Sequence, residues 1–445
     1  MSFKSCSAEL DVLLRGFIVD LIIRRARLRH RENLVDVGVK SGRIITIAPS
    51  VAEKGAVEID AGGNLVSPPF CDPHVHLDAV LSVGDPRYNQ SGTLLEGIAI
   101  WSERKPTLTK ELIRANALEA IKWEVAQGCL KIRTHADVFA PELIAVEALL
   151  ELKGDLKDEV DIQVVAFPQD GIYAAPHGEK LMEEALRMGA DVVGGIPHNE
   201  LTREDGIRDL EYAFSLAEKY EKPIDVHCDE TGDEQSRFIE VLAKLAIERG
   251  FEGRVAASHA TAMHNYNNDY AFKLIGILQR AGIHVITNPF DNAVLQNRFD
   301  GYPRRRGHTR VDELLARGVN VAIGHDSIMD PWYPLGRGSM LQAANLLLHT
   351  AHMSGYAQIS QLYDMITVNS ARTLGVAGEY QIAEGNTADL IVVNASSEME
   401  AIRLLPECLW VIRRGKVLAT TSPARSRVEL GDTAEDIDFK RGETQ

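Results

Sequence analysis

Residues 65–76, LVSPPFCDPHVH, are a strand-like apolar stretch that ends in two histidines separated by one residue. Amphipathic stretches with helical spacing, such as 110–128, 178–190 and 206–222, follow it and alternate with more strand-like sequence. The seven further strands that we predict are 130–138, 161–169, 191–197, 223–230, 254–260, 284–289 and 320–327. Strands that alternate with helices form parallel sheets with right-handed crossovers. Because eight such strands close a barrel, the sequence predicts an α/β fold with a (β/α)8 TIM-type barrel.

The sequence at both chain ends has a different pattern: short stretches alternate apolar and polar residues and are separated by glycines. They are DLIIRRARL (20–28), VDVGVKSGRIITIA (35–48), AVEID (56–60), TADLIVVNA (387–395), CLWVIRRGKVLATT (408–421) and RVEL (427–430). We expect them to form one small β-sandwich from residues 18–68 and 375–432, with the barrel at 69–374. The charged tail after Asp432 is expected to be loosely held.

Composition excludes several classes of protein. The net charge of -16 disfavours nucleic-acid binding, because a polyanion would be repelled. The five cysteines are scattered without a CxxC pair, which favours reduced thiols and a cytoplasmic location. We expect no membrane span, since no apolar run reaches about 18 residues. Residues 1–17 look like an irregular leader, and the charge of Arg15 argues against a signal peptide.

Histidines and one aspartate lie at the ends of several predicted strands. His74 and His76 end the first strand, and alternate residues of a strand share a face, so both imidazoles can point at one centre. His227, His259 and Asp326 end the fifth, sixth and eighth strands. A single HxH pair is a weak pattern, but this combination at one end of a barrel indicates a site for zinc or ferrous iron.

These motifs resemble the amidohydrolase superfamily, and within it the bacterial cytosine deaminases. The resemblance covers nearly the whole chain beyond the leader, and HCDE (227–230) and DPWYPLG (330–336) are its most specific parts. The other similar motifs are PHVHLD (73–78), NQSGTLLEGI (89–98), FPQDGI (167–172), IPHNELTREDG (196–206), EQSRF (234–238), SHATAMH (258–264), YPRRRGHTRV (302–311) and NSARTLG (369–375). The resemblance implies hydrolytic deamination of a free pyrimidine base by a homo-oligomer.

The resemblance also implies which residues hold the metal. One divalent ion, Fe2+ or Zn2+, is expected on His74, His76, His227 and Asp326. Two-metal members carry a bridging lysine at the end of strand four, whereas DVVGGIP (191–197) has none, so we expect one metal. His135 and His198 are therefore interpreted as supporting residues. The HNE string at 198–200 fits the HxE motif of the small zinc deaminases, but no PCxxC follows it.

Three residues are expected to carry the chemistry. Asp326, besides contacting the metal, can take a proton from the attacking water, and Glu230 can protonate the ring nitrogen beside the reacting carbon. His259 can orient the water. Without the resemblance, Glu230 would be read as a surface residue at the start of a helix.

Four residues are expected to contact the base. The Gln169 amide can pair with a ring carbonyl and the neighbouring N–H, the backbone at Leu94 can receive a ring N–H, and Trp332 offers an apolar wall. The family's cytosine-specific members read GHDD where this chain reads GHDS, with Ser327 in the last position. A shorter, uncharged residue leaves room for one methyl group, which favours 5-methylcytosine as substrate, with cytosine and 5-fluorocytosine also accepted.

Several alternatives remain open from the sequence. Ser327 could be a neutral variant in an ordinary cytosine deaminase. The substrate could be another cyclic amidine, such as isoguanine or creatinine. A third alternative is a barrel that has become a non-catalytic scaffold, although every expected ligand and Glu230 are present.

Overall fold

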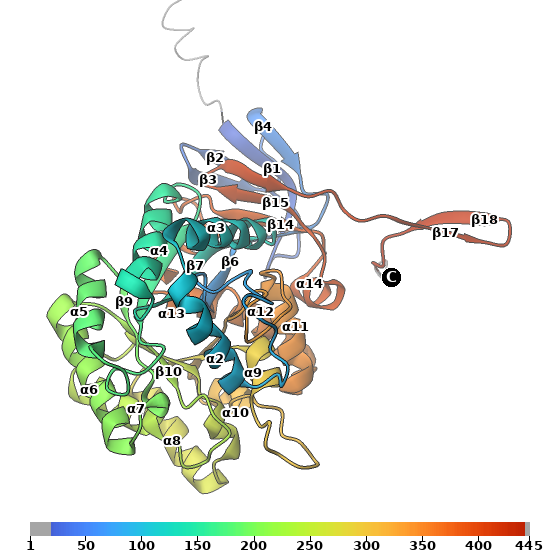
Figure 1. Ribbon diagram of the computed structural model, residues 1–445. Coiled ribbons are helices and arrows are strands. Elements are labelled where there is room, and N and C mark those ends of the chain that lie inside the picture. The colour runs from blue at the N-terminus through green and yellow to red at the C-terminus, as the bar shows by residue number, and fades with distance from the viewer. Residues whose placement is uncertain (1–18, 441–445) are drawn as a thin grey trace, which may run out of the picture. The chain divides into compact units, whose positions relative to one another are not determined.

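The computed structural model describes residues 19–440 (Figure 1). The chain divides into two compact units: one holds the chain up to Pro69 and from Gly378 onward, and the other is Phe70–Ala377. The expected leader at 1–17 and Cys6 lie outside the described residues.

The larger unit is built on a parallel sheet of eight strands in the sequential order β13 to β6. Each of the eight predicted barrel strands overlaps an observed one, although residues 65–67 of the first stretch belong to the sheet of the smaller unit. The observed barrel strands are β6 (Phe70–Val75), β7 (Cys129–Asp137), β8 (Asp161–Phe167), β9 (Val192–Val193), β10 (Ile224–Cys228), β11 (Val255–His259), β12 (His284–Thr287) and β13 (Asn320–Ile323).

The first and last strands come together just past the end of β13. Val75 forms a parallel bridge with Asp326, the His76 N–H donates to the Asp326 carbonyl at 3.0 Å, and the Asp326 N–H donates to the His74 carbonyl at 2.8 Å. These bonds make the sheet a nearly closed barrel. They also fix the backbone of three expected metal ligands on the closing seam.

Helices connect the strands and lie around the barrel (Figure 1). They are α2 (Leu94–Arg104), α3 (Lys110–Ala126), α4 (Ile144–Asp155), α5 (Gly178–Met188), α6 (Arg203–Tyr220), α7 (Phe238–Glu248), α8 (Asn268–Arg280), α9 (Pro289–Leu295), α10 (Val311–Ala316), α11 (Met340–Thr350), α12 (Tyr356–Met365) and α13 (Val368–Thr373). The amphipathic stretches at 110–128 and 178–190 are α3 and α5. The stretch expected from residue 206 is α6, which begins earlier because the Thr202 side chain accepts the Asp205 N–H and caps it.

The smaller unit joins both chain ends in one mixed sheet. Its strands are β1 (Val19–Leu28), β2 (Val35–Lys40), β3 (Arg43–Ala48), β4 (Gly55–Asp60), β5 (Leu65–Ser67), β14 (Leu390–Val393), β15 (Cys408–Arg413) and β16 (Lys416–Thr420). The two ends meet where β5 pairs antiparallel with β14. The sheet branches at β1, which pairs with β2, β4 and β5, and apolar side chains from both ends fill its core.

The RVEL stretch does not join this sheet, contrary to expectation. It lies in β17 (Ser426–Leu430), which pairs only with β18 (Thr433–Ile437) among the described strands. The left-handed backbone of Gly431 reverses the chain between them. Because most residues of the hairpin are exposed on both faces, it has no apolar side to bury against the sheet.

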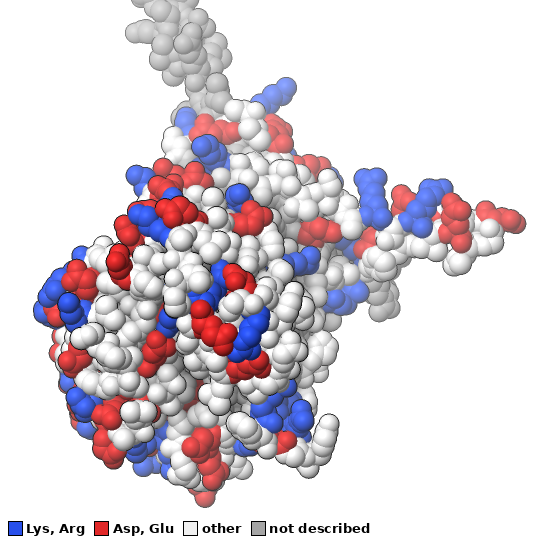
Figure 2. Space-filling model, in the orientation of Figure 1, with Lys and Arg blue, Asp and Glu red and all other residues white. Residues whose placement is uncertain are grey.

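Two properties of the surface and helices complete the description. Figure 2 shows Lys and Arg side chains interspersed with Asp and Glu over the described residues of one face. Within 19–440, no helix combines the length and the apolar character that crossing a bilayer requires.

Candidate metal centre and active site

The closing seam of the barrel places two imidazoles and one carboxylate together. The Nε2 atoms of His74 and His76 lie 3.4 and 3.5 Å from Asp326 Oδ1. All three side chains are buried. Asp326 has a left-handed φ of 71°, which is uncommon for a residue other than glycine and is held here by the seam hydrogen bonds.

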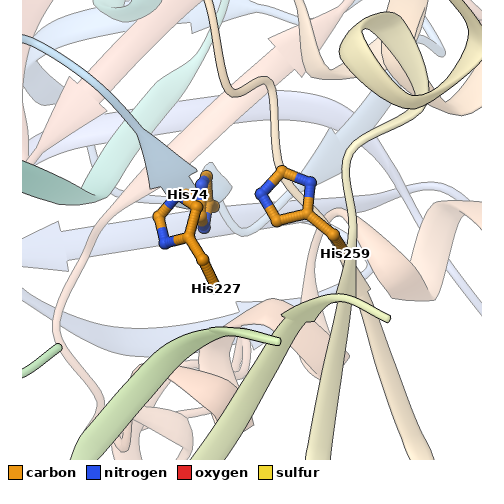
Figure 3. Close-up of side chains that lie close together, drawn as sticks. All are labelled: His74, His227 and His259. Carbon is orange, nitrogen blue, oxygen red and sulfur yellow. The ribbon is translucent and has the colours of Figure 1, made fainter. Parts of the chain in front are cut away.

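Two further imidazoles come from the ends of β10 and β11. Figure 3 shows the rings of His227 and His259 beside that of His74. His76 Nε2 and His227 Nε2 are 3.1 Å apart, and the nitrogens of His74, His227 and His259 gather within 4.8 Å. The ring of Phe167 stacks on His227, with centroids 4.1 Å apart, and so fixes its orientation. The structure therefore brings all five strand-end residues to one point.

The donor set fits a metal ion. Burial lowers the pKa of His76 to about 4 and holds the pKa of His227 far below its ordinary value, so both rings are neutral and keep a lone pair for a metal. Burial acts to raise the pKa of Asp326, but the imidazoles of His74 and His259 lower it below its ordinary value. Its carboxylate is therefore ionised. The buried His74 Nε2 has no hydrogen-bond partner among the described residues, which leaves it free to bind a cation.

A series of buried hydrogen bonds holds the His74 ring in place. Its Nδ1 lies 2.9 Å from the Ser258 hydroxyl, which donates to Asp225 Oδ1 at 2.7 Å. Asp225 in turn receives a hydrogen bond from Arg133 at 2.9 Å. Such outer partners fix the tautomer and orientation of a metal-binding imidazole.

Helix α9 and the residue on either side of it contribute polar side chains that the sequence analysis missed. The amides of Asn288 and Asn292 lie 3.2 and 3.0 Å from ring nitrogens of His259. Just after the helix, the Gln296 amide donates to Glu230 Oε1 at 3.1 Å. The string NPFDN (288–292) after the seventh strand is the only trace of this group in the sequence, and it has no motif of its own.

Glu230 is buried beside this group of histidines and Asp326. Its Oε1 lies 3.6 Å from His259 Nδ1. Burial, followed by the charge of Asp326, raises the pKa of Glu230 well above its ordinary value, although the hydrogen bond from Gln296 opposes the shift. A carboxyl with a raised pKa holds its proton to higher pH than an ordinary glutamate does, which suits a general acid.

A cavity of about 500 Å³ opens over these residues. The predicted substrate contacts all line it, together with the three predicted catalytic residues: Leu94, Gln169, Glu230, His259, Asp326, Ser327 and Trp332. Phe167, His198 and Asp291 also lie in the wall. All seven of these predicted residues therefore line one cavity.

The loop after β13 positions Trp332, the residue predicted to form an apolar wall for the base. Asp330 Oδ1 accepts hydrogen bonds from the backbone N–H groups of Trp332 and Tyr333, at 2.9 and 3.0 Å. The Trp332 ring faces that of His76, with centroids 6.3 Å apart. It packs so closely on α2 that a Cβ added to Gly97 would lie 2.5 Å from Trp332 Cδ1.

His135 and His198, interpreted as supporting residues, lie near the predicted metal ligands. The His135 ring is 4.0 Å from that of His74, centroid to centroid, and His74, His135 and Asp225 form a second close group. Asp225 is already paired with Arg133, whose positive charge disfavours a second cation there. His198 lies in the cavity wall, and burial lowers its pKa to about 4.

Comparisons with known proteins agree with this architecture. A family model described as "Amidohydrolase family" matches residues 57–419. The N-isopropylammelide isopropyl amidohydrolase of Pseudomonas sp. (strain ADP) is 34% identical over 409 residues, 90% of this chain and 97% of that protein.

Two groups of solved structures are also similar. The 5-methylcytosine deaminase from Klebsiella pneumoniae, liganded with phosphonocytosine, matches with a TM-score of 0.88 and 45% identity over 93% of this chain and 100% of that one. The same enzyme with 5-fluorocytosine gives a TM-score of 0.89. An adenosine deaminase from Xanthomonas campestris with bound zinc, 17% identical, shares the fold with a TM-score of 0.67 over 90% of this chain and 92% of that one.

Proposed function

This chain belongs to the amidohydrolase family, and we propose that it deaminates a free aminopyrimidine base, converting 5-methylcytosine and water into thymine and ammonia. The observation that carries the proposal is Ser327, which lines the cavity directly after Asp326. The 45% identity to a 5-methylcytosine deaminase over 93% of the chain supports the same substrate.

One divalent ion, Fe2+ or Zn2+, would be held by His74, His76, His227 and Asp326. When bound, it lowers the pKa of a coordinated water from 15.7 toward about 7. The packing at the end of β9 supports a single ion. A Cβ added to Gly194 would lie 2.4 Å from the Ala166 carbonyl oxygen, so a bridging lysine side chain has no room there.

The protein side chains then divide the proton transfers between them. Asp326 takes a proton from the attacking water, and His259, held by the amides of α9, orients that water. Glu230 gives its proton to the ring nitrogen next to the reacting carbon, which makes that carbon more electrophilic. Oxygen bonds to the carbon, the bond to the exocyclic nitrogen breaks, and the nitrogen leaves as ammonia with the one proton that Asp326 took from the water. Glu230 recovers its proton from the added hydroxyl as that group becomes the new carbonyl.

The remaining contacts orient the flat base. The Gln169 amide would pair with the ring carbonyl and the neighbouring N–H, the Leu94 backbone would receive a ring N–H, and Trp332 would cover one face, since all three residues line the cavity. At the C5 edge, Ser327 leaves room for a methyl group where a carboxylate would resist it. One methyl group is worth about 1–3 kcal/mol in selectivity.

Steady-state kinetics with defined Fe2+ or Zn2+ loading test the proposal. The panel contains cytosine, 5-methylcytosine and 5-fluorocytosine, with isoguanine, creatinine and N-isopropylammelide as competing substrates. We expect kcat/KM for 5-methylcytosine to equal or exceed that for cytosine. The variant Ser327→Asp should shift this ratio toward cytosine by about 10- to 200-fold, while Ser102→Asp, on an exposed part of α2, should leave it unchanged. A strong cytosine preference that Ser327→Asp does not alter would refute the 5-methylcytosine assignment.

Three broader properties belong to this proposal. The whole activity resides in the barrel at 69–374, and the module of 18–68 and 375–432 contributes no reacting group, because each proposed site residue lies within Phe70–Ala377. The four described cysteines are buried and no disulfide joins any two of them, which supports a reducing, cytoplasmic location. A homo-oligomer is expected, and light scattering of the purified chain measures it.

A further inference from the structure

Glu200, the last residue of the HNE string at 198–200, is a buried acid that the proposed mechanism does not use. It follows the short helical turn η3 (Pro197–Asn199), between β9 and α6. The residue is 9% exposed and lines the cavity. Because a buried carboxyl group is costly unless its oxygens are hydrogen-bonded, the partners of Glu200 indicate what it does.

Both carboxylate oxygens of Glu200 accept backbone N–H groups from one loop, which follows β8. Oε1 accepts the N–H groups of Ile172 and Tyr173, at 2.6 and 3.0 Å. Oε2 accepts the N–H group of Ala174 at 2.7 Å. Three consecutive donors thus converge on one side chain. Since these bonds engage both oxygens, Glu200 acts on the loop rather than on a bound molecule.

The loop turns closely around the Glu200 carboxylate. Gly171 has a left-handed φ of 86°, and its N–H donates to the Pro168 carbonyl at 2.9 Å. A Cβ added to Gly171 would lie 3.1 Å from each of the two Glu200 oxygens. A glycine at this position therefore lets the chain adopt both the turn and the close approach.

Asp209, in α6, is a further partner of Glu200. The two side chains are hydrogen-bonded, and burial, followed by the charge of Glu200, raises the pKa of Asp209 well above its ordinary value. A protonated Asp209 is a donor. Its bond to Glu200 therefore adds to the three bonds from the loop and does not compete with them.

The same loop carries Gln169, the residue proposed to pair with the ring carbonyl of the base. The amide of Asn199, the neighbour of Glu200, donates to the Gln169 carbonyl oxygen at 3.2 Å. Asp170 accepts a hydrogen bond at 2.6 Å from Lys105, just after α2. The loop is thus held at its start by Asn199 and Lys105 and further along by Glu200. Because the backbone of Gln169 is fixed in this way, the direction of its side chain depends on these bonds.

We propose, on the basis of the function proposed above, that Glu200 is a positioning residue that holds this loop so that the Gln169 amide points at the ring carbonyl and the neighbouring N–H of the base. It acts through Gln169 and touches no reacting atom. In the small zinc deaminases the glutamate of HxE moves protons. The HNE string of this chain has a different use, since its glutamate holds the loop that binds the base.

This role affects KM rather than kcat. Gln169 contacts a part of the base that does not react, so its contact is present both in the bound substrate and in the transition state. Weakening such a contact raises the KM and leaves kcat unchanged. A loss of correctly folded enzyme does the reverse, because it lowers the apparent kcat and leaves the KM as it was.

The test is a double-mutant cycle, measured by steady-state kinetics with 5-methylcytosine and the metal-loaded enzyme. Glu200→Gln keeps the size of the side chain but leaves one acceptor oxygen for three N–H donors. It should raise the KM by about tenfold, with kcat within about threefold of the wild type. In a Gln169→Leu background the same change should alter the KM by less than about twofold, because the group that Glu200 positions is gone.

Glu179→Gln is the matched control and should change neither constant. Glu179 is exposed and contacts the same loop through the Tyr173 hydroxyl, which donates to it at 2.9 Å. An equal rise in the KM in both backgrounds would show that Glu200 does not act through Gln169. An unchanged KM in Glu200→Gln would show that the site does not depend on this carboxylate. Either result would overturn the inference.

Amide hydrogen exchange measures the loop itself without substrate. Glu200→Gln should speed the exchange of the 172–174 amides by at least about tenfold, while the amides of α5 exchange as in the wild type. Unchanged protection at 172–174 would contradict the proposal. If Glu200→Gln does not fold, Asn199→Ala removes one bond to the loop and carries the same cycle, with an expected rise in the KM of about threefold.

Failure of the proposed function is distinguishable from failure of this inference. A wild-type enzyme that turns over none of the pyrimidines contradicts the function, and the cycle is then run with the substrate that the panel identifies. A wild-type enzyme that is active on pyrimidines, but whose KM effects at Glu200 and Gln169 are additive, refutes the role of Glu200 alone.

Discussion

Two groups of residues beside the same cavity are positioned in different ways. One, the strand-end wall, consists of His74, His76, His227, His259 and Asp326, whose backbones are set by the pairing of the barrel strands and by the closing seam. The other, the α9 wall, consists of Asn288, Asp291, Asn292 and Gln296, of which Asp291 lines the cavity. Its amide side chains reach His259 and Glu230. The difference indicates that the barrel fixes the metal chemistry, while a short helix adjusts the groups that act on the base.

The largest expected effect in this comparison comes from Glu230, the acid between the two walls. Glu230→Gln keeps the shape and removes the proton donor, so kcat should fall by about 10²- to 10⁴-fold. Bound metal, measured by elemental analysis, should not change because Glu230 is not among the proposed ligands. Glu234→Gln, an exposed neighbour, serves as control. A kcat within threefold of the wild type would exclude Glu230 as the acid.

The α9 wall should give a smaller loss without loss of metal. Asn292→Leu is similar in size but removes the amide that lies 3.0 Å from His259 Nδ1. Outer partners of this kind are typically worth 10- to 100-fold, so we expect kcat to fall by about that factor with metal content unchanged. If the variant loses its metal instead, His259 belongs to the ligand set and the two walls are not separate in function.

The same contrast explains what the sequence could predict. His74, His76, His227 and Asp326 could be placed together because the side-chain direction in a strand repeats every two residues and parallel strands end at one edge. Asn292 and Asp291 could not, because NPFDN has no such repeat and the orientation of a seven-residue helix depends on tertiary packing. The hairpin at RVEL was misplaced for a related reason: alternation predicts a strand, but not the strand with which it pairs.

Replacing Gly97 tests whether the close packing of α2 on Trp332 shapes the base pocket. Gly97→Ala would push a methyl group against the indole, so we expect the KM to rise by roughly tenfold. Gly154, in α4, is the matched control because a Cβ there meets nothing within 4 Å. Gly154→Ala should add about 0.5–1 kcal/mol to the free energy of unfolding and leave the KM unchanged. Equal KM values for the two variants would show that the Trp332 wall does not touch the base.

The smallest expected effect is a shift in pH dependence, and it measures how α9 acts on the strand-end wall. Burial and the charge of Asp326 raise the pKa of Glu230, and the hydrogen bond from Gln296 lowers it. An acid must be protonated to act, so kcat/KM falls as the pH rises through this pKa. Gln296→Met removes the bond that stabilises the ionised form. The pKa should therefore rise, and the alkaline limb of the profile should move to higher pH by about one unit, since one unit corresponds to about 1.4 kcal/mol and a hydrogen bond has a similar value.

At pH values below that limb, the rate of Gln296→Met should stay within about threefold of the wild type, because Glu230 is then protonated in both proteins. Gln279→Met, in α8, controls for the loss of an amide far from the site. A limb that moves to lower pH would mean that Gln296 stabilises the protonated form of Glu230. In that case the hydrogen bond from Gln296 would raise the pKa of Glu230 instead of lowering it, and the α9 wall would help to keep Glu230 protonated.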